Sequence, residues 1–437
     1  MSFVDVKWAD DLSRPKTRTL PGEIIGYRKN GLPIRLQAGG APNKANASLG
    51  GYQTQGDVVQ KLTDGTDLND MWAEFQATLD VFNEHRQTLV DFLTFPVTNN
   101  IETVPQGTTV DFEVASEYGV PKGVGTKINY FQMGYDFNWY DIALRYTWKF
   151  LLEADARQVE MIHQQVLEGD NRNIFNKVMN ALFRNTNRTA TITGNNYTVY
   201  SLYNGTLAAA EVPPPYKSNT FDTTHNHYLT TFLAAPLEPS NQLHSNGVVD
   251  AAKAGFEQMM DHLRHHGYGE SEGATMIGLV NKQEADVIRL WRLGQPGNLY
   301  RAHYDFVPSP ASAPLILPNA LLGAGLLGSQ PPSSINGLPV VGSYGPVLIV
   351  QEDFIPPGYV VMFSTGGTAA SPNPVGLREH ANATVRGLQL LPGNQTGYPL
   401  QDSFYRRGFG TGIRQRGAAV ILQVVNSGTY TIPALYA

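Results

Sequence analysis

Apolar residues recur at helical spacing over the stretch from Thr147 to Phe183, and charged residues occupy its other faces. No proline interrupts the stretch. Gly169, which precedes Asp170, is expected to kink or break it, because an interior glycine costs about 1 kcal/mol relative to alanine. A helix of roughly 35 residues would be about 50 Å long. We therefore predict a spine along which other parts lie. Its apolar stripe is Val159, Ile162, Val166, Ile174, Val178 and Leu182.

A second helical pattern begins at Asp67, with Asp67 or Thr66 as the expected N-cap, and ends before Pro96. Because the row is short and Arg86 interrupts it, we expect it to pack on the body of the protein, and a two-helix coiled coil is the alternative. The row consists of Leu68, Trp72, Phe75, Leu79, Phe82, Leu89 and Leu93.

From Thr108 the apolar period changes to two, which predicts a long β-hairpin with a turn-rich tip over Tyr118–Gly125. An isolated hairpin is marginally stable in water. Its apolar side chains therefore need a partner surface, which a neighbouring subunit would supply. The outgoing strand carries Val110, Phe112 and Val114, and the returning strand carries Asn129, Phe131, Met133, Tyr135, Phe137 and Trp139.

The remaining chain divides into short predicted elements. Residues 1–66 show no sustained period and are expected to be disordered or to form an extended arm laid on another surface. Residues 189–231 are rich in Asn, Thr and Tyr and are expected to be a β insertion. A helix is expected around Val249, Ala252, Phe256, Met259 and Leu263, and strands at 276–280, 338–341, 347–350, 359–363 and 418–425. Asn281 and Glu284 should open a helix that ends near Leu293.

Charge is scarce in this chain. Charged residues make up 16% of it, Gly and Pro number 43 and 28, and the net charge is −6. Such a composition indicates extensive protein–protein contact or a loop-rich β protein, and it argues against general polyanion binding.

No cysteine is present, and the first residues do not resemble a signal peptide. The apolar run 315–327 is interrupted by glycine and flanked by proline, so we expect a loop against protein rather than a membrane segment.

Candidate chemistry is sparse. His262, His265 and His266 are the best metal candidates, since two of them share a helix face beside Asp261, although a position near a helix C-terminus also explains them. His225 and His227 are weaker candidates. The glycines of 408–412 are expected to form a turn, because the context of a dinucleotide fingerprint is missing. With no catalytic motif visible, we predict a protein that is not an enzyme and has no cofactor.

Four arginines near the C-terminus are interleaved with aromatic residues. They could form a stacking and phosphate-contacting patch, but in an acidic chain we favour ion pairs with carboxylates of a neighbouring subunit. These arginines are Arg406, Arg407, Arg414 and Arg416.

The order of these parts resembles the tailed-phage major capsid proteins of the HK97-like fold. Residues 373–379 and 398–417, with the strand that follows, are similar to capsid proteins of actinobacterial phages. The resemblance implies an α+β fold with an extended N-terminal arm, a long β-hairpin (E-loop), a long spine helix, an α/β axial domain and a peripheral β-sheet. The implied divisions are an arm (1–66), an amphipathic helix (67–95), the hairpin (96–145), a peripheral domain (146–221), an axial domain (222–365) and a C-terminal return (366–437).

The resemblance also implies a function. Pentamers and hexamers of this chain would form an icosahedral shell that encloses double-stranded DNA in the virion, after assembly in the host cytoplasm. Portal, decoration and separate scaffolding proteins are implied partners, and no membrane is. Some relatives crosslink a hairpin lysine to a neighbour's asparagine. The alternatives are an encapsulin-like nanocompartment and a sugar- or metal-dependent enzyme with a β-rich lobe. Predicted hairpin contacts between subunits are Phe112, Tyr118, Lys122, Lys127 and Phe131.

Overall fold

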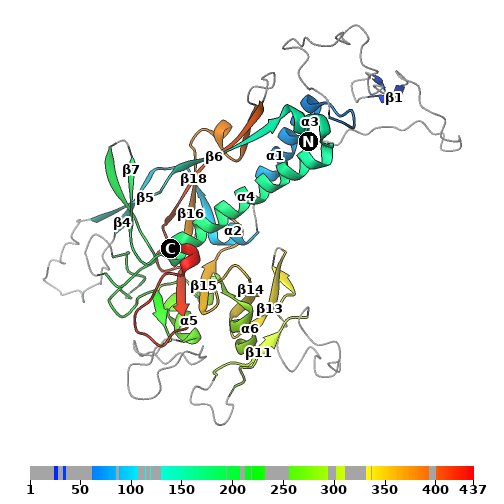
Figure 1. Ribbon diagram of the computed structural model, residues 1–437. Helices are drawn as coiled ribbons and strands as arrows, with labels where there is room; N and C mark the ends of the chain where they lie inside the picture. The colour runs from blue at the N-terminus through cyan, green and yellow to red at the C-terminus, as the bar shows by residue number, and fades with distance from the viewer. Residues whose placement is uncertain are drawn as a thin grey trace, which may run out of the picture. The chain divides into compact units, whose positions relative to one another are not determined.

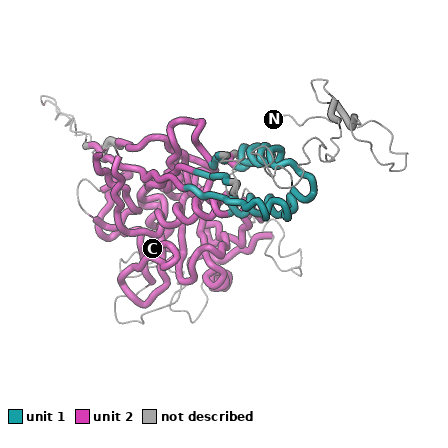
Figure 2. The backbone as a smooth tube through the Cα atoms, turned by 45° about the horizontal axis from the view of Figure 1, so that its top comes forward, with its two compact units in different colours: residues 1–82, 141–168, 388–406 teal, residues 83–140, 169–387, 407–437 magenta. Residues whose placement is uncertain are grey.

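The computed structural model forms two compact units (Figures 1 and 2). Unit 1 comprises residues 1–82, 141–168 and 388–406, and unit 2 comprises residues 83–140, 169–387 and 407–437. Two of the boundaries fall inside the longest helix and the longest strand among the described residues. The structure describes residues 24–27, 33–35, 62–84, 88–106, 114, 119, 129–192, 194–206, 212–217, 219–231, 255–293, 302–310, 331–335, 337–392 and 400–437.

Helices and strands come in groups along the described chain (Figure 1). The helices are α1 Leu68–Glu84, α2 Thr88–Leu93, α3 Trp148–Glu153, α4 Ala156–Phe183, α5 Phe256–His265 and α6 Lys282–Ile288. The strands are β1 Ile24–Tyr27, β2 Pro33–Arg35, β3 Thr94–Val97, β4 Ile101–Gln106, β5 Asn129–Gly134, β6 Asn138–Thr147, β7 Arg188–Ile192, β8 Asn195–Val199, β9 Tyr228–Thr230, β10 Thr275–Val280, β11 Phe306–Pro308, β12 Ser334–Ile335, β13 Leu338–Tyr344, β14 Val347–Gln351, β15 Tyr359–Thr365, β16 Val375–Glu379, β17 Gln389–Pro392, β18 Leu400–Ile413 and β19 Ala419–Gln423.

The predicted spine is present as α3 followed by α4, but the break does not lie at Gly169. It lies at Ala154 and Asp155, where Ala154 is extended and buried. Thr63 N donates to the Ala154 carbonyl at 3.2 Å, and Ala156 N donates to the Asp64 carboxylate at 3.2 Å. These contacts satisfy backbone groups that the break would otherwise leave unpaired. Gly169 lies inside α4, where the cost of glycine is offset by buried apolar residues in each half of the helix.

An alanine at Gly169 should therefore stabilise the protein by up to about 1 kcal/mol, because alanine restricts the unfolded chain and its Cβ would meet no atom within 4 Å. The measurement is the denaturant midpoint of unfolding. Gly273 is a matched control with equal space but a φ of +77°, so alanine there should destabilise by about 1 kcal/mol. A loss of stability in G169A would show that this part of α4 needs the freedom of glycine.

Unit 1 has a core in which α1 and the first half of α4 participate. Asp67 caps α1 by accepting from Asn69 N at 2.9 Å, as predicted. Phe75 is buried and stacks on His163, with 4.0 Å between the ring centroids. His163 Nδ1 in turn lies 2.7 Å from the Tyr405 hydroxyl of β18. The predicted packing of this helix on the body is thus confirmed, while α2 belongs to unit 2 and leads into β3.

Unit 2 is built on an eight-stranded sheet with the order β11-β13-β14-β10-β15-β19-β9, and β12 pairs with β13. Both faces of this sheet are buried. Ile277 of β10 and Phe363 of β15 join one core with α2 and the second half of α4. Met276 and Met362, their neighbours in sequence, join a second core with α5 and α6. This explains why the predicted strands 338–341, 347–350, 359–363 and 418–425 read as nearly continuous apolar runs.

A second sheet contains β17-β18-β16-β3, and β6 also pairs with β18. Strand β5 matches the start of the predicted returning strand and pairs with β4, with Ile101 opposite Gly134 and Gln106 opposite Asn129, whereas Val110 and Phe112 of the predicted first strand lie outside the described residues. The described ladder lies on the N-terminal side of the predicted first strand at Val110. The returning strand ends at Gly134 and does not reach Trp139, because the chain leaves the ladder there and joins β18 as β6.

The remaining elements match the predictions in part. In the region expected to be a β insertion, β7 and β8 form an antiparallel hairpin and β9 pairs in parallel with β19. Asn281 caps α6 by accepting from Gln283 N, but Glu284 accepts from Gly358 N at 2.8 Å. Helix α6 ends at Ile288, short of Leu293. Val249, Ala252, Arg86 and the run 315–327 lie outside the described residues.

Candidate assembly surfaces

The segment Tyr135–Phe137 follows β5, and we call it the hairpin root. It crosses β18 at a row of glycines. Gly408, Gly410 and Gly412 lie within β18, so the predicted turn is wrong. Every second residue of a strand faces the same side, and on this side a Cβ would collide with the crossing chain. A Cβ at Gly410 would lie 1.8 Å from the Asp136 carbonyl oxygen, and one at Gly412 would lie 2.6 Å from the Tyr135 ring. The glycines thus create the space that the crossing segment occupies.

Two arginines fasten this crossing within unit 2. Arg188 of β7 pairs with the Asp136 carboxylate, and its Nη2 donates to Thr411 Oγ1 at 3.2 Å. Arg378 of β16 donates from Nη1 to the Tyr135 carbonyl at 3.0 Å, and its guanidinium lies 4.8 Å from the centroid of the Phe137 ring. Asp136 N also donates to the Thr411 carbonyl. The base of the β4–β5 hairpin is therefore held rigidly.

Arg414 is bound at the same root. Its Nη1 donates to Glu102 of β4 at 3.1 Å, and the Tyr135 hydroxyl donates to the other oxygen of that carboxylate at 2.6 Å. The Arg414 guanidinium lies 4.0 Å from the centre of the Phe95 ring, within cation–π range. Burial, followed by the bond to Glu102, raises the pKa of Tyr135, so the phenol remains a neutral donor. Arg414 thus links the hairpin to β3.

The other predicted arginines also have partners within the chain. Arg407 pairs with Asp170 of α4, and each side chain is 6% exposed. Burial raises the pKa of Asp170, while Arg407 opposes that shift. Arg416 is buried and donates from Nε to the Ser201 carbonyl at 2.9 Å. In unit 1, Arg406 Nε donates to Gln389 Oε1 at 3.1 Å.

These positions bear on the predicted arginine contacts between subunits. Burial inside the subunit leaves Arg407 and Arg416 little surface to offer a neighbour or a phosphate, whereas Arg406 and Arg414 are partly exposed. The contact role of Arg406 and Arg414 stays a prediction. Sequence reasoning missed the glycine row as a crossing site, although the spacing Gly-x-Gly-x-Gly already placed three glycines on one face of any strand.

Of the predicted hairpin contacts, Phe131 lies in β5 opposite Val104. Phe112, Tyr118, Lys122 and Lys127 lie outside the described residues. Around the root, apolar side chains are open to solvent: Tyr130 of β5 is 64% exposed and Trp139 of β6 is 51% exposed.

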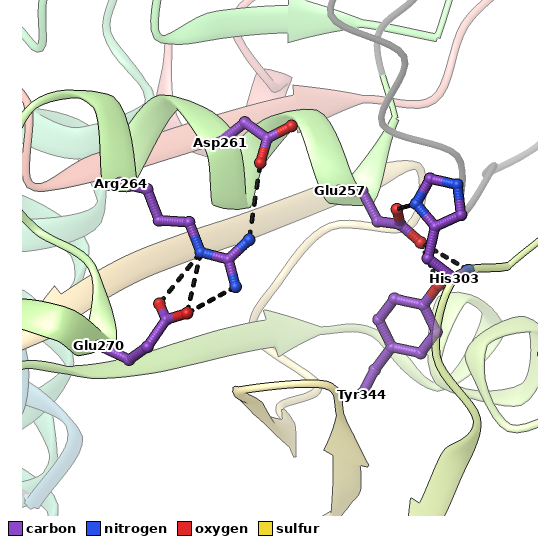
Figure 3. Close-up of polar contacts among 6 residues, drawn as sticks. All are labelled: Glu257, Asp261, Arg264, Glu270, His303 and Tyr344. Carbon is purple, nitrogen blue, oxygen red and sulfur yellow. Dashed lines mark hydrogen bonds and ion pairs between the residues drawn. The ribbon is translucent and has the colours of Figure 1, made fainter.

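Polar contacts on α5 have a structural role (Figure 3). Glu257 is buried, accepts a bond from the Tyr344 hydroxyl, and its carboxylate lies 2.5 Å from His303 Nδ1. Arg264 donates to Glu270, with 2.7 Å between Nη2 and Oε1, and lies 3.6 Å from Asp261. These contacts join α5 to Tyr344 of β13, to His303 before that strand and to Glu270 after the helix. Each of the three carboxylates, Glu257, Asp261 and Glu270, therefore already has a partner.

The histidines proposed as metal candidates come together at one end of α5, beside His225 and His227. Across the residues that the structure describes, no group of three or more His, Cys, Asp or Glu side chains is arranged to hold a metal ion. Nor does any helix in those ranges have the length and apolarity needed to cross a membrane.

No family model and no curated protein matches the sequence. Among solved structures, a chain from Mycobacterium phage Patience is 46% identical and superposes with a TM-score of 0.65, over 90% of this chain and 98% of that one. This chain belongs to the HK97-like major capsid proteins of tailed phages. It is a structural component of the virion and assembles with its own copies into the capsid shell, as the resemblance implied.

More distant similarities were also found. The mature capsid of bacteriophage PhiM1 is 10% identical with a TM-score of 0.45, over 78% of this chain and 87% of that one. An encapsulin of Synechococcus elongatus is 11% identical with a TM-score of 0.37, over 81% of this chain and 96% of that one.

Proposed function

We propose that this capsid protein forms pentamers and hexamers of an icosahedral shell that encloses double-stranded DNA. The similarity to the mycobacteriophage chain over nearly its whole length carries this proposal. A net charge of −6 supports a shell that does not hold packaged DNA tightly. Assembly takes place in the host cytoplasm, with separate scaffolding, portal and decoration proteins as partners. The expected domain divisions, with an axial domain over 222–365, belong to the same proposal.

The hairpin is the contact that we assign to the neighbouring subunit. Its root is fixed by Arg188, Arg378 and Arg414, and Tyr130 beyond the root is exposed. Modest contacts of this kind, repeated around closed rings, add up to a shell far more stable than any single contact. The proposed contact residues are Phe112, Tyr118, Lys122, Lys127, Phe131, Arg406 and Arg414.

Deleting Tyr118–Gly125 should abolish or strongly reduce shell formation while leaving the subunit folded, because the deletion removes the turn that the sequence predicts as the tip of the hairpin. The measurement is particle size by light scattering and negative-stain microscopy, after coexpression with the phage's other capsid genes. The control is Asn195→Ser, in the separate β7–β8 hairpin, which should assemble as the unmodified chain does.

The proposal is supported if the wild-type chain forms shells, or rings of five and six subunits. It is contradicted if the wild-type chain stays monomeric or dimeric in the coexpression. If the deletion variant assembles as well as the wild type, the contact role of the hairpin tip is wrong. Nuclease-protected DNA inside particles from infected cells distinguishes the virion from a nanocompartment that encloses cargo proteins.

A further inference from the structure

Five histidines from two distant segments pack together in unit 2. His225 and His227 belong to the segment 219–227, which we name the strap, and the other three lie in the last turn of α5 and just after it. The rings of His225 and His265 are stacked, with 4.2 Å between their centroids. His227 lies 5.6 Å from His262 and 5.5 Å from His266 by the same measure. Imidazole rings therefore form much of the contact between the strap and α5.

The inner rings of the cluster are buried. His227, His262 and His266 are 0%, 6% and 4% exposed, and His266 stacks on Phe221 of the strap at 3.6 Å. His227 Nδ1 lies 2.8 Å from the Ala419 carbonyl. Within the described structure, His227 Nε2, His262 Nδ1 and both ring nitrogens of His266 have no hydrogen-bond partner. Such rings fit as neutral groups, and a charged ring would have unsolvated N–H donors.

Little negative charge is available to compensate a proton. Asp222 is the carboxylate of the strap that acts on the cluster, and its Oδ1 already lies 2.8 Å from His225 Nδ1. The Arg416 guanidinium, from the chain before β19, is a positive charge that acts on His227. On α5 itself, Asp261 is paired with Arg264. The tyrosines packed nearby, Tyr203, Tyr228 and Tyr268, all have raised pKa values because they are buried.

We propose that the five-histidine cluster is a proton-operated latch, in which proton binding to a buried ring opens the contact between the strap and the end of α5.

The pKa values of the buried rings determine whether acid opens or closes the contact between the strap and α5. Burial, reinforced by the neighbouring histidines, lowers the pKa of His227 and of His266 to about 3 and lowers that of His262 well below 6.5. Once the strap opens, these rings regain the ordinary value of about 6.5. The open state therefore binds more protons between those values. The latch is fully closed above pH 6.5, and closure weakens as the pH falls toward about 3.

The same proton linkage determines how steeply opening depends on pH. Each histidine that becomes protonated only on opening favours the open state about tenfold per pH unit within this window. Hydrogen exchange of assembled particles, followed by mass spectrometry and corrected for the intrinsic pH dependence of exchange, should show this at residues 219–231 and 256–268. We expect their protection to fall at least tenfold per unit between about pH 6 and about pH 4, while the central strands β10 and β15 keep theirs.

Two variants test the mechanism. His266→Phe keeps the stacking on Phe221 but removes one titrating ring, so the loss of protection should become about tenfold shallower per pH unit. His262→Phe removes a second buried titrating ring, whose Nδ1 has no hydrogen-bond partner in the described structure, and should make the loss of protection shallower by the same factor. His380→Gln, outside the cluster, is the control and should behave as the wild type.

Unchanged protection of both segments down to about pH 4 would overturn the latch. So would an equal pH dependence in the wild type and in H266F. Should H266F fail to assemble, His262→Phe decides alone: a shallower loss of protection supports the latch and an unchanged one refutes it.

Discussion

An alanine at Gly410 is expected to prevent the chain from folding at growth temperature. Its Cβ would lie 1.8 Å from the Asp136 carbonyl oxygen and 2.3 Å from the carbonyl carbon. Both atoms belong to the backbone, and Asp136 is held by Thr411 and Arg188. Ordinary overpacking costs about 1–3 kcal/mol because side chains can move aside. Here no side chain can yield, so the cost should exceed that range and consume much of a typical folding stability of about 5–15 kcal/mol.

The measurement is the yield of soluble, folded subunit, followed by denaturant unfolding of any that is recovered. Gly408→Ala provides a graded comparison, since its Cβ would meet the rings of Phe137 and Trp139, which can rotate, and its cost should be smaller. Gly169→Ala, in the open position on α4, should be stabilising. A G410A protein of wild-type stability would show that the hairpin root does not cross β18 at this point.

Replacing Arg407 by leucine should cost about 3–5 kcal/mol, because the change leaves a buried carboxylate without its partner. Asp170 is as buried as the arginine, and Glu379 lies 4.0 Å from the same guanidinium. Without Arg407, burial should raise the pKa of Asp170 further, since the opposing charge is lost. The folded variant would then hold a proton that the unfolded chain releases above about pH 4. The penalty should therefore be largest at neutral pH and decrease as the pH falls.

Denaturant unfolding at several pH values measures this effect, and the double variant R407L/D170L isolates the pair, because it removes both charges and should recover most of the loss. Arg289→Leu is the surface control. Its ion pair with Asp286 on α6 is largely solvated, so its loss should be within about 0.5 kcal/mol. Equal losses for R407L and R289L would contradict the role of the buried pair.

Local patterns in the sequence were sufficient for most elements of this fold. The stripe through Val159 and Val178 predicted the spine, because side-chain spacing on a helix is a local property. Apolar runs predicted the central strands for the same reason. They could not say that the spine breaks at Ala154 rather than at Gly169. That position depends on bonds from Thr63 and Asp64, which lie far away in the chain.

The partners of the C-terminal arginines and of the histidines could not be predicted from the sequence. Four arginines near the C-terminus suggested contacts between subunits, yet Arg407 and Arg416 are used inside the subunit. The number of charges does not reveal their partners, since Asp170 and Ser201 lie more than 200 residues away in the chain and meet the arginines only in the folded structure. The same limit applies to the histidines, which the sequence presented as two separate groups.

The sequence by itself determined the periodicity of helices and strands, the lack of a catalytic motif and the resemblance to phage capsid proteins, because these depend on residue order alone. Only the tertiary structure decided that Gly410 is a crossing point, that Arg414 binds the hairpin root and that five histidines share one site. The reason is physical: each of these features is a contact between segments far apart in the chain, and its energy depends on burial and distance.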